Sequence, residues 1–363
     1  MAGEQAGHQK QSGDHRMKIL YGIQGTGHGH ISRAREIVPL LTEHAELDIL
    51  MSGTNCKMTL DGKTAIRKHG LSLAYNSKGS VSYLKTALGI QPVRFLQDLW
   101  STDPSEYDLV ISDFEPITAW ASRTCGTPSI ALSHQASFLS DKSPRPERKS
   151  VMAEQILKNF APCDIPVGFH FKRYDSFILP PVIRKEVKEL QPEEGDHITV
   201  YLPAFDPHEI SGMLGNIRET QWQLFSPACD EPFQSDNVRV FPVGNGPFLE
   251  SLKSSRGVLT SAGFETCAEA MYLKKKLFVI PIRNQYEQLC NAASLKEMGV
   301  RIADTADNGF IPKLRDWLRS AEIVPLPEAA DIPKLRESLF GFADMASIAP
   351  HQNESEAVSA API

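Results

Sequence analysis

The fold is decided by residues 257–292, whose sequence is GVLTSAGFETCAEAMYLKKKLFVIPIRNQYEQLCNA. An apolar opening leads into a turn of small residues that ends at Gly263. A helical stretch follows, in which Glu265 and Glu269 lie four residues apart and so share one face. A second apolar run spans residues 276–281. The pattern predicts a strand, a turn, a helix, a second strand and then a polar loop.

This unit also predicts a kind of ligand. In an open α/β sheet, ligands bind beyond the carboxyl ends of the strands, so the small-residue turn and the polar residues 283–291 should face one crevice. Free backbone amides at the helix start suit an anion, and carboxylates and amides suit sugar hydroxyls. A phosphorylated sugar fits that layout.

Length and composition limit the class of protein. A chain of 363 residues is long enough for two domains. A net charge of −6 argues against a general nucleic-acid binder. The six scattered cysteines lack a CxxC spacing, which indicates reduced thiols in a cytoplasmic protein without a structural zinc site. No apolar run is long enough to span a bilayer, and peripheral membrane contact stays open.

The order of apolar runs and turns predicts an α/β protein with two Rossmann-like domains that face each other across a cleft. The expected segments are a disordered leader (1–16), a first domain (17–185), a second domain (186–340) and a partly disordered tail (341–363). Strands are expected at 18–23, 47–51, 71–75, 108–112, 129–133, 197–202, 223–226, 238–242, 276–281 and 300–303, and another at the apolar opening that contains Val258 and Leu259. Helices are expected at 32–44, 151–160, 209–217 and 311–320, one or two more within 81–100, one between Pro116 and Gly126 and one after Gly263, with irregular connections at 178–187 and 244–248.

The first turn, GTGHGH at residues 25–30, contains Gly27, His28, Gly29 and His30. A histidine here could take a proton from a hydroxyl, because its ordinary pKa lies near neutrality. A phosphate-binding loop in which the histidines only cap the helix is the plainer alternative. A dinucleotide-binding GxGxxG motif also competes, but His30 stands where its last glycine belongs.

Asp113 follows an apolar strand at its carboxyl end. A carboxylate there could orient an imidazole ring and stabilise its protonated form, and Glu115 could serve instead. Asp113 could equally cap the next helix. No third histidine or cysteine stands at ligand spacing, so no metal site is expected.

Four motifs resemble one family of enzymes. They are GHGHISRA (27–34), VISDFEP (110–116), TSAGFETCAEA (260–270) and EQLCNA (287–292). The chain resembles glycosyltransferases of the two-domain GT-B fold, close to a bacterial family with a GHxxRA start. It is more distantly similar to the peptidoglycan N-acetylglucosaminyltransferase and the plant-type UDP-glucosyltransferases. The resemblance covers nearly all of residues 18–320.

The resemblance implies an inverting glycosyltransferase that moves a sugar from a nucleotide-diphosphate donor, expected to be a UDP-sugar, to an acceptor hydroxyl. It implies His30 as the base, Asp113 as its support, Thr266 with the Gly263 turn at the phosphates, Glu269 at the ribose, and Glu287 with Gln288 at the donor sugar. Ser261 stands where the plant-type signature has a phosphate-binding histidine. The nucleotide sugar is a substrate, and no cofactor is expected.

The acceptor could be a small molecule, a glycan or a lipid-linked compound, and no nucleic acid is expected as a partner. Residues 81–100 and 140–149 are candidates for its site, although helix packing and a solvated loop explain them as well. Three other functions remain open: a sugar-nucleotide epimerase of the same fold, a non-catalytic nucleotide-sugar-binding protein, and an NAD-dependent enzyme.

Overall fold

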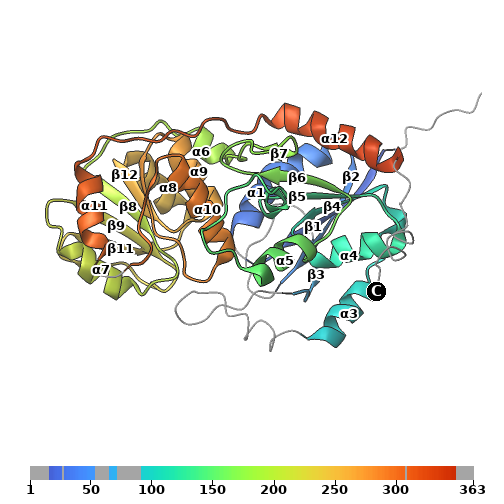
Figure 1. The fold of residues 1–363 in the computed structure, drawn as a ribbon, viewed down its shortest axis with the longest axis horizontal. Helices are drawn as coiled ribbons and strands as arrows, with labels where there is room; N and C mark the ends of the chain where they lie inside the picture. Colours follow the sequence, from blue (N-terminus) through green and yellow to red (C-terminus); the bar gives the residue numbers. More distant parts are fainter. Residues whose placement is uncertain (1–15, 27, 54–64, 72–90, 307–308, 349–363) are drawn as a thin grey trace, which may run out of the picture.

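The computed structural model describes residues 16–26, 28–53, 65–71, 91–306 and 309–348, although not the side chains of residues 28 and 342–348. Two α/β domains lie end to end, with their helices packed around two separate sheets (Figure 1). The prediction of two Rossmann-like domains is confirmed.

The first domain is built on a parallel sheet with strand order β3-β2-β1-β4-β5-β6-β7. Its strands are β1 (Lys18–Gln24), β2 (Glu46–Ser52), β3 (Ala65–Lys68), β4 (Leu109–Asp113), β5 (Ser129–Ser133), β6 (Ile165–Phe169) and β7 (Ile178–Leu179). Its helices are α1 (His28–Thr42), α3 (Pro92–Trp100), α4 (Pro116–Cys125), α5 (Val151–Asn159) and α6 (Lys185–Lys188), with single 3₁₀ turns η1 (Pro104–Glu106) and η2 (Gln135–Leu139).

The second domain has strand order β10-β11-β9-β8-β12-β13-β14, parallel except for the β10–β11 hairpin. Its strands are β8 (His197–Tyr201), β9 (Gln221–Ser226), β10 (Phe233–Ser235), β11 (Val238–Pro242), β12 (Gly257–Thr260), β13 (Lys276–Val279) and β14 (Arg301–Ile302). Its helices are α7 (Pro207–Gly215), α8 (Asn245–Ser254), α9 (Phe264–Tyr272), α10 (Tyr286–Glu297) and α11 (Phe310–Arg319).

The central strands are apolar because helices cover both faces of each sheet. All residues of β4 and β12 are buried, as continuous apolar runs in parallel sheets should be. Helix α4 shows how local sequence sets the ends of an element. Glu115 caps its first turn, Pro116 supplies a preset φ at the first helical position, and Gly126 ends it with a φ of 76°.

Two segments expected to be irregular form regular elements. Strand β7 and helix α6 fall at the ends of residues 178–187, and α8 begins within the predicted loop 244–248. Pro247 is compatible with α8 because it lies in the first turn, where its missing N–H has no partner to lose. The strand expected at residues 71–75 lies almost entirely outside the described residues.

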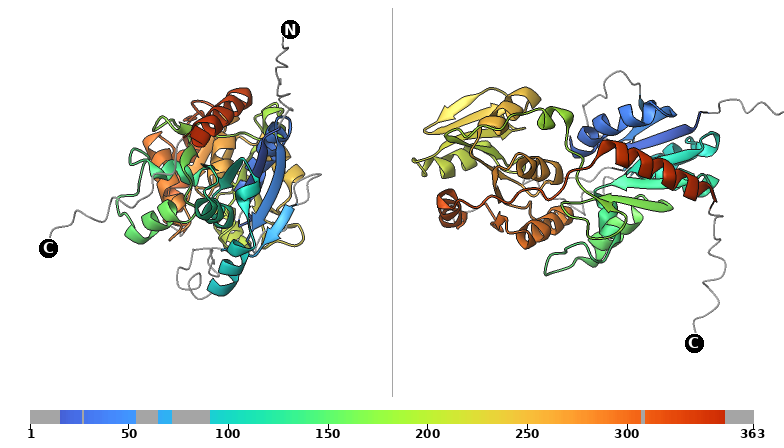
Figure 2. Two further views of the ribbon diagram at one scale, coloured as in Figure 1. Left: turned by 90° about the vertical axis from the view of Figure 1, so that its right-hand side faces the viewer. Right: turned by 90° about the horizontal axis from the view of Figure 1, so that it is seen from above.

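The chain returns to the first domain at its end. Helix α12 (Ile332–Ile348) lies along α1, and its Leu335 and Leu339 are buried in a core shared with that domain (Figure 2). Where the two connections between the domains meet, the amide of Ala330 donates to the carbonyl of Pro181 at 2.8 Å. The predicted boundary after residue 340 falls within α12, which packs against α1 and β5 of the first domain.

Candidate functional site

A cavity of about 780 Å³ lies between the two domains. Residues at or just beyond the carboxyl ends of strands from both sheets line it, among them Gln24, Phe114, His134, Tyr201 and Ser261. Both sheets therefore point the ends that usually bind ligands at one space. The site predicted from the small-residue turn and the site predicted from the GTGHGH turn belong to this one cavity.

His30 lines the cavity and is bonded to Asp113 at its back. The distance from His30 Nδ1 to Asp113 Oδ1 is 2.7 Å. Because a carboxylate only accepts, Nδ1 donates in this contact, and Nε2 is the ring nitrogen left for a ligand. The predicted pairing of these two side chains is present in the structure.

Arg33 is a part of this arrangement that sequence reasoning did not single out. Its Nε and Nη2 donate to the two oxygens of Asp113 at 2.9 and 2.6 Å. Burial alone would raise the pKa of Asp113, but Arg33 and then His30 outweigh it and hold that pKa below its usual value. Asp113 is thus a buried anion fixed by two partners.

Glu115, the alternative partner for the histidine, does not contact it. Its carboxylate accepts from the amides of Ile117 and Thr118 and from the hydroxyls of Ser52 and Thr118, at 2.6 to 2.8 Å. Burial raises its pKa. Glu115, not Asp113, is the helix cap, so the two roles left open from the sequence are distributed between the two acids.

The remaining residues of the first turn divide in two. Gly29 lines the cavity next to His30. Gly27 lies outside the described residues, and the side chain of His28 is likewise not described. Helix α1 begins at His28, so His30 sits in its first turn.

The second domain contributes the start of α9 to the cavity. Ser261, Gly263 and Thr266 all line it. Gly263 occupies the N-cap position of α9 and has no side chain to accept from the first amides of the helix. These amides and the helix dipole make this end attractive to an anion.

The two acidic residues of α9 each bind an arginine from outside their domain. Glu265 accepts from Arg33 Nη1 at 2.7 Å. Glu269 accepts from Nε and Nη2 of Arg184, which caps α6 in the connection between the domains. Burial raises the pKa of Glu269, and the Arg184 contacts oppose that rise. The shared carboxylate face predicted from spacing exists, but it already holds two cations.

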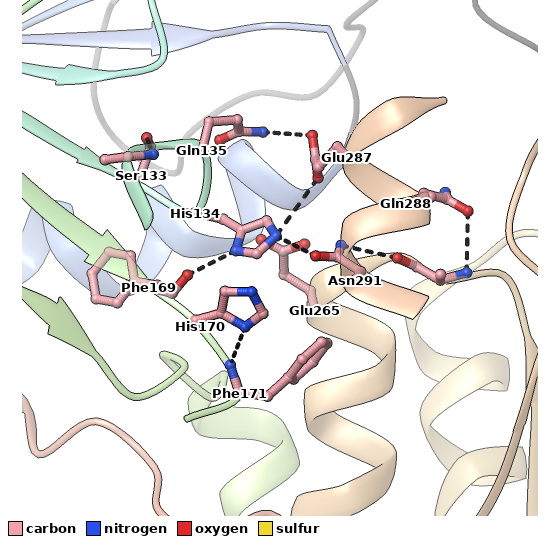
Figure 3. Close-up of polar contacts among 12 residues, drawn as sticks. Ser133, His134, Gln135, Phe169, His170, Phe171, Glu265, Glu287, Gln288 and Asn291 are labelled. Atoms are coloured by element: carbon pink, nitrogen blue, oxygen red, sulfur yellow. Dashed lines mark hydrogen bonds and ion pairs between the residues drawn. The ribbon is translucent and has the colours of Figure 1, made fainter. Parts of the chain in front are cut away.

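Glu287 and Gln288 are consecutive residues in the first turn of α10, and their side chains point to different partners (Figure 3). Glu287 Oε2 accepts from Gln135 Nε2 of the first domain at 2.9 Å. Gln288 Oε1 accepts from the amides of Ala262 and Ile282, at 3.1 and 3.0 Å. These two bonds fix the orientation of the Gln288 side-chain amide and leave its NH₂ group available to donate. Gln288 also lines the cavity.

His134 was missed by sequence reasoning. It follows β5 as Phe114 follows β4, is 1% exposed, and stacks on Phe264 of α9 with ring centroids 3.9 Å apart. Its Nδ1 lies 2.7 Å from the carbonyl oxygen of Phe169 and its Nε2 lies 2.8 Å from Asn291 Oδ1 (Figure 3). The signal that could identify it in the sequence is its position at the carboxyl end of an apolar strand, the same feature that singles out Asp113.

One wall of the cavity is apolar. Ile156, Leu157 and Phe160, on or just after α5, line it beside Phe114. Phe114 has a φ of 54°, a backbone conformation unusual for a bulky residue, and its ring packs against Phe160 at 4.8 Å. The strained backbone sets an aromatic ring directly after the aspartate that holds His30.

Two segments are predicted as candidates for the acceptor site, and residues 81–90 of the first lie outside the described residues. Neither α3, in the described part of 81–100, nor residues 140–149 line this cavity. Arg145 of the second segment bonds Glu154 and the carbonyl of Phe138 instead. The neighbouring helix α5 lines the cavity instead.

The described residues contain no group of three or more His, Cys, Asp or Glu side chains arranged to hold a metal ion. No helix among them is long and apolar enough to cross a membrane.

Comparison with known proteins identifies one family. A family model described as glycosyl transferase family 1 covers residues 17–318. A search of curated proteins finds no match.

Solved structures give the same fold at low identity. The glycosyltransferase SnogD from Streptomyces nogalater is 16% identical with a TM-score of 0.55, over 92% of this chain and 96% of that one. Arabidopsis thaliana UGT89C1 complexed with quercetin is 11% identical with a TM-score of 0.57, over 93% and 96%. Phytolacca americana UGT2, complexed with UDP-2fluoro-glucose and pterostilbene, is 12% identical with a TM-score of 0.52, over 93% and 96%.

Proposed function

The chain belongs to glycosyl transferase family 1, and we propose that it moves a sugar from a UDP-sugar to an acceptor hydroxyl with inversion at the anomeric carbon. The observation that carries this proposal is the bonding of His30 to Asp113 beside the same cavity that the start of α9 lines. The first domain offers a base for a hydroxyl, and the second domain offers a helix end for a diphosphate.

The chemical step is a single displacement. The acceptor hydroxyl gives its proton to Nε2 of His30 while its oxygen forms a bond to the anomeric carbon of the donor. The bond from that carbon to the diphosphate oxygen breaks, and the nucleoside diphosphate leaves with the electron pair. Asp113 stabilises the imidazolium that forms, and its own anion is maintained by Arg33.

The donor fits the second domain. We assign its diphosphate to the start of α9, where amides and the hydroxyls of Ser261 and Thr266 line the cavity and the helix dipole favours developing negative charge. The hydroxyl of Ser261 is neutral and cannot supply the charge of a protonated histidine, so backbone amides carry more of this role here. Glu269 retains lone pairs beyond its two bonds to Arg184 and can accept from a ribose diol.

The donor sugar belongs beside Glu287 and Gln288. Gln288 presents its NH₂ group as a donor, because its oxygen is held by two backbone amides. Glu287 can accept from sugar hydroxyls, as carboxylates do. The pair thus offers donors and acceptors to neighbouring hydroxyls.

The acceptor fits the apolar wall formed by Phe114, Ile156, Leu157 and Phe160. We propose an alcohol or phenol with an apolar body, because burying such a surface gives about 25 cal/mol for each Å² removed from water. Two structures of similar fold were solved with the phenolic compounds quercetin and pterostilbene, which supports phenols as the first acceptors to try.

The test is release of UDP from UDP-glucose and UDP-N-acetylglucosamine, with and without a panel of phenols and apolar alcohols. We expect release that requires an acceptor, and a product whose anomeric configuration by NMR is opposite to that of the donor. We also expect His30→Ala to lower kcat by about 10²-fold or more.

Other outcomes point to other functions. Isomerisation of the sugar without UDP release would indicate an epimerase. Binding of a UDP-sugar by calorimetry that survives His30→Ala, with no turnover for any acceptor, would indicate a non-catalytic binding protein. Retention of configuration would overturn the single displacement.

A further inference from the structure

An ion pair joins the two domains directly behind the proposed base. Arg33 of α1 is 3% exposed and donates from Nη1 to Glu265 Oε1 at 2.7 Å. The same guanidinium uses Nε and Nη2 to hold both oxygens of Asp113. One arginine therefore bonds the carboxylate that orients His30 and a carboxylate of the opposite domain.

The carboxylate of Glu265 is also packed against the first turn of α1. A Cβ atom at Gly29 would come within 2.5 Å of Glu265 Oε2 and 2.7 Å of its carboxyl carbon. Real Cβ atoms essentially never come this close, so a side chain at position 29 would require the Glu265 carboxylate to shift from its place beside Arg33. Gly29 and Arg33 are one helical turn apart, and together they form a seat for Glu265.

The contacts form a continuous series from one domain to the other. Glu265 bonds Arg33, Arg33 bonds Asp113, and Asp113 bonds His30. At the other end, Glu265 is the second residue of α9, the helix whose start is the proposed phosphate site. The base and the donor site are thus joined through three side chains.

We propose that Glu265 is a positioning residue: seated between Gly29 and Arg33, it aligns the Asp113–His30 pair only when the domains are closed on the donor. The inference rests on the proposed function. When the domains separate, Arg33 loses a partner for Nη1 while its other nitrogens stay on Asp113. Water then replaces the fixed carboxylate at Nη1, so the guanidinium is held less firmly, and any shift of it moves Asp113 and then the imidazole.

Charge supports the same role. Burial alone would lower the pKa of Arg33, but Asp113 and Glu265 outweigh it and raise that pKa above its ordinary value. Arg33 is therefore a permanent cation that two anions from different domains share. Removing the anion of the second domain leaves the cation to Asp113 alone.

The first test compares two substitutions that each remove an ion pair between the domains. Glu265→Gln removes the Arg33 pair, and Glu297→Gln removes the exposed pair with Lys172, whose atoms lie 3.3 Å apart. We expect Glu265→Gln to lower kcat by about 10-fold or more, within the range for a misplaced catalytic group, and to change the KM for UDP-sugar by less than about threefold. Glu297→Gln should leave both within about twofold. An equal effect of the two substitutions, or a change in KM alone, would overturn the proposal.

The second test uses the seat itself. Gly29→Ala should reduce kcat in the wild-type background because its methyl group displaces the Glu265 carboxylate. In a Glu265→Ala background the same methyl group meets no carboxylate, and we expect no further loss. Additive losses in this double-mutant cycle would mean that Gly29 acts without Glu265 and would contradict the proposal.

A third measurement does not depend on turnover. The proton on His30 Nδ1, bonded to a carboxylate, should give a downfield NMR signal that His30→Ala removes. With UDP present, that signal should weaken or shift in Glu265→Gln and stay in place in Glu297→Gln. A signal unchanged in Glu265→Gln would reject the positioning role, whereas absence of any sugar transfer by the wild type would reject the proposed function alone.

Discussion

Arg184 holds both carboxylate oxygens of Glu269, with Nε 2.5 Å from Oε1 and Nη2 2.8 Å from Oε2. The arginine belongs to the connection between the domains, and the glutamate belongs to α9. Both side chains are largely buried. The pair therefore ties the connection to the helix at which we place the donor.

Replacing one partner of this pair should destabilise the fold. Arg184→Gln leaves the Glu269 carboxylate buried without its cation, and we expect the free energy of unfolding to fall by about 3 kcal/mol. Urea denaturation at pH 7 measures this. Adding Glu269→Gln should recover most of the loss, because no buried charge is then left unpaired. Equal stability of the single variant and wild type would show that water replaces Arg184 at no cost.

Asp113→Asn should reduce turnover without preventing donor binding. An amide at this position can donate to Nδ1 of His30, which favours the wrong tautomer and leaves Nε2 protonated. We expect kcat to fall by about 10²-fold or more with saturating UDP-sugar. The matched control is Asp175→Asn, since Asp175 bonds Ser140 and Lys142 and does not line the cavity. Comparable kcat values for the two variants would remove Asp113 from the mechanism.

His170 should make the fold less stable in mild acid. Burial holds its pKa well below the usual value, with His134 and then Arg145 adding to the effect, so the folded protein keeps the ring neutral. The unfolded chain takes up a proton near pH 6.5, and this favours unfolding as the pH falls from about 7 to 5.

His170→Phe removes this proton uptake and tests the effect. Below pH 6.5 the wild type should lose up to about 1.4 kcal/mol per pH unit more than the variant. Urea denaturation of both proteins at several pH values measures the difference. Parallel stability curves between pH 7 and 5 would contradict the prediction.

Leu157→Asn should weaken acceptor binding selectively. The side chain lies on the apolar wall. Burying it against an acceptor contributes roughly 1.5 kcal/mol or more to the free energy of binding, so its loss should raise the KM for an apolar phenol about tenfold. The affinity for UDP by calorimetry should not change. Val151→Asn on the same helix is the control, because Val151 is 77% exposed and outside the cavity. A larger effect on UDP than on the phenol would place the acceptor elsewhere.

Local patterns predicted those parts of the molecule that local physics determines. Apolar runs between turns gave the central strands of both sheets, and parallel sheets require the carboxyl ends of such strands to meet at one edge. This is why Asp113 and the turn at Gly263 could be placed at one cleft from the sequence. His134 occupies an equivalent position after β5 and satisfied the same rule, but no rule said that its ring would stack on Phe264.

Partners across the cleft could not be predicted. Arg33 and Glu265 are separated by 232 residues, and Arg184 and Glu269 by 85, so no spacing along the chain relates them. From the sequence, the face that carries Glu265 and Glu269 is predicted to suit sugar hydroxyls. In the structure both carboxylates form ion pairs with arginines, because buried carboxylates require cations or hydrogen-bond donors.

The return of α12 to the first domain has a mechanical consequence. The polypeptide crosses between the domains twice, and the two crossings are bonded to each other where Ala330 donates to Pro181. A single tether would permit the domains to twist as well as to separate. Two tethers fastened at one point leave rotation about that point as the easy movement, so opening for substrate exchange should follow one repeatable arc. Each closure then returns Glu265 to the same place beside Gly29.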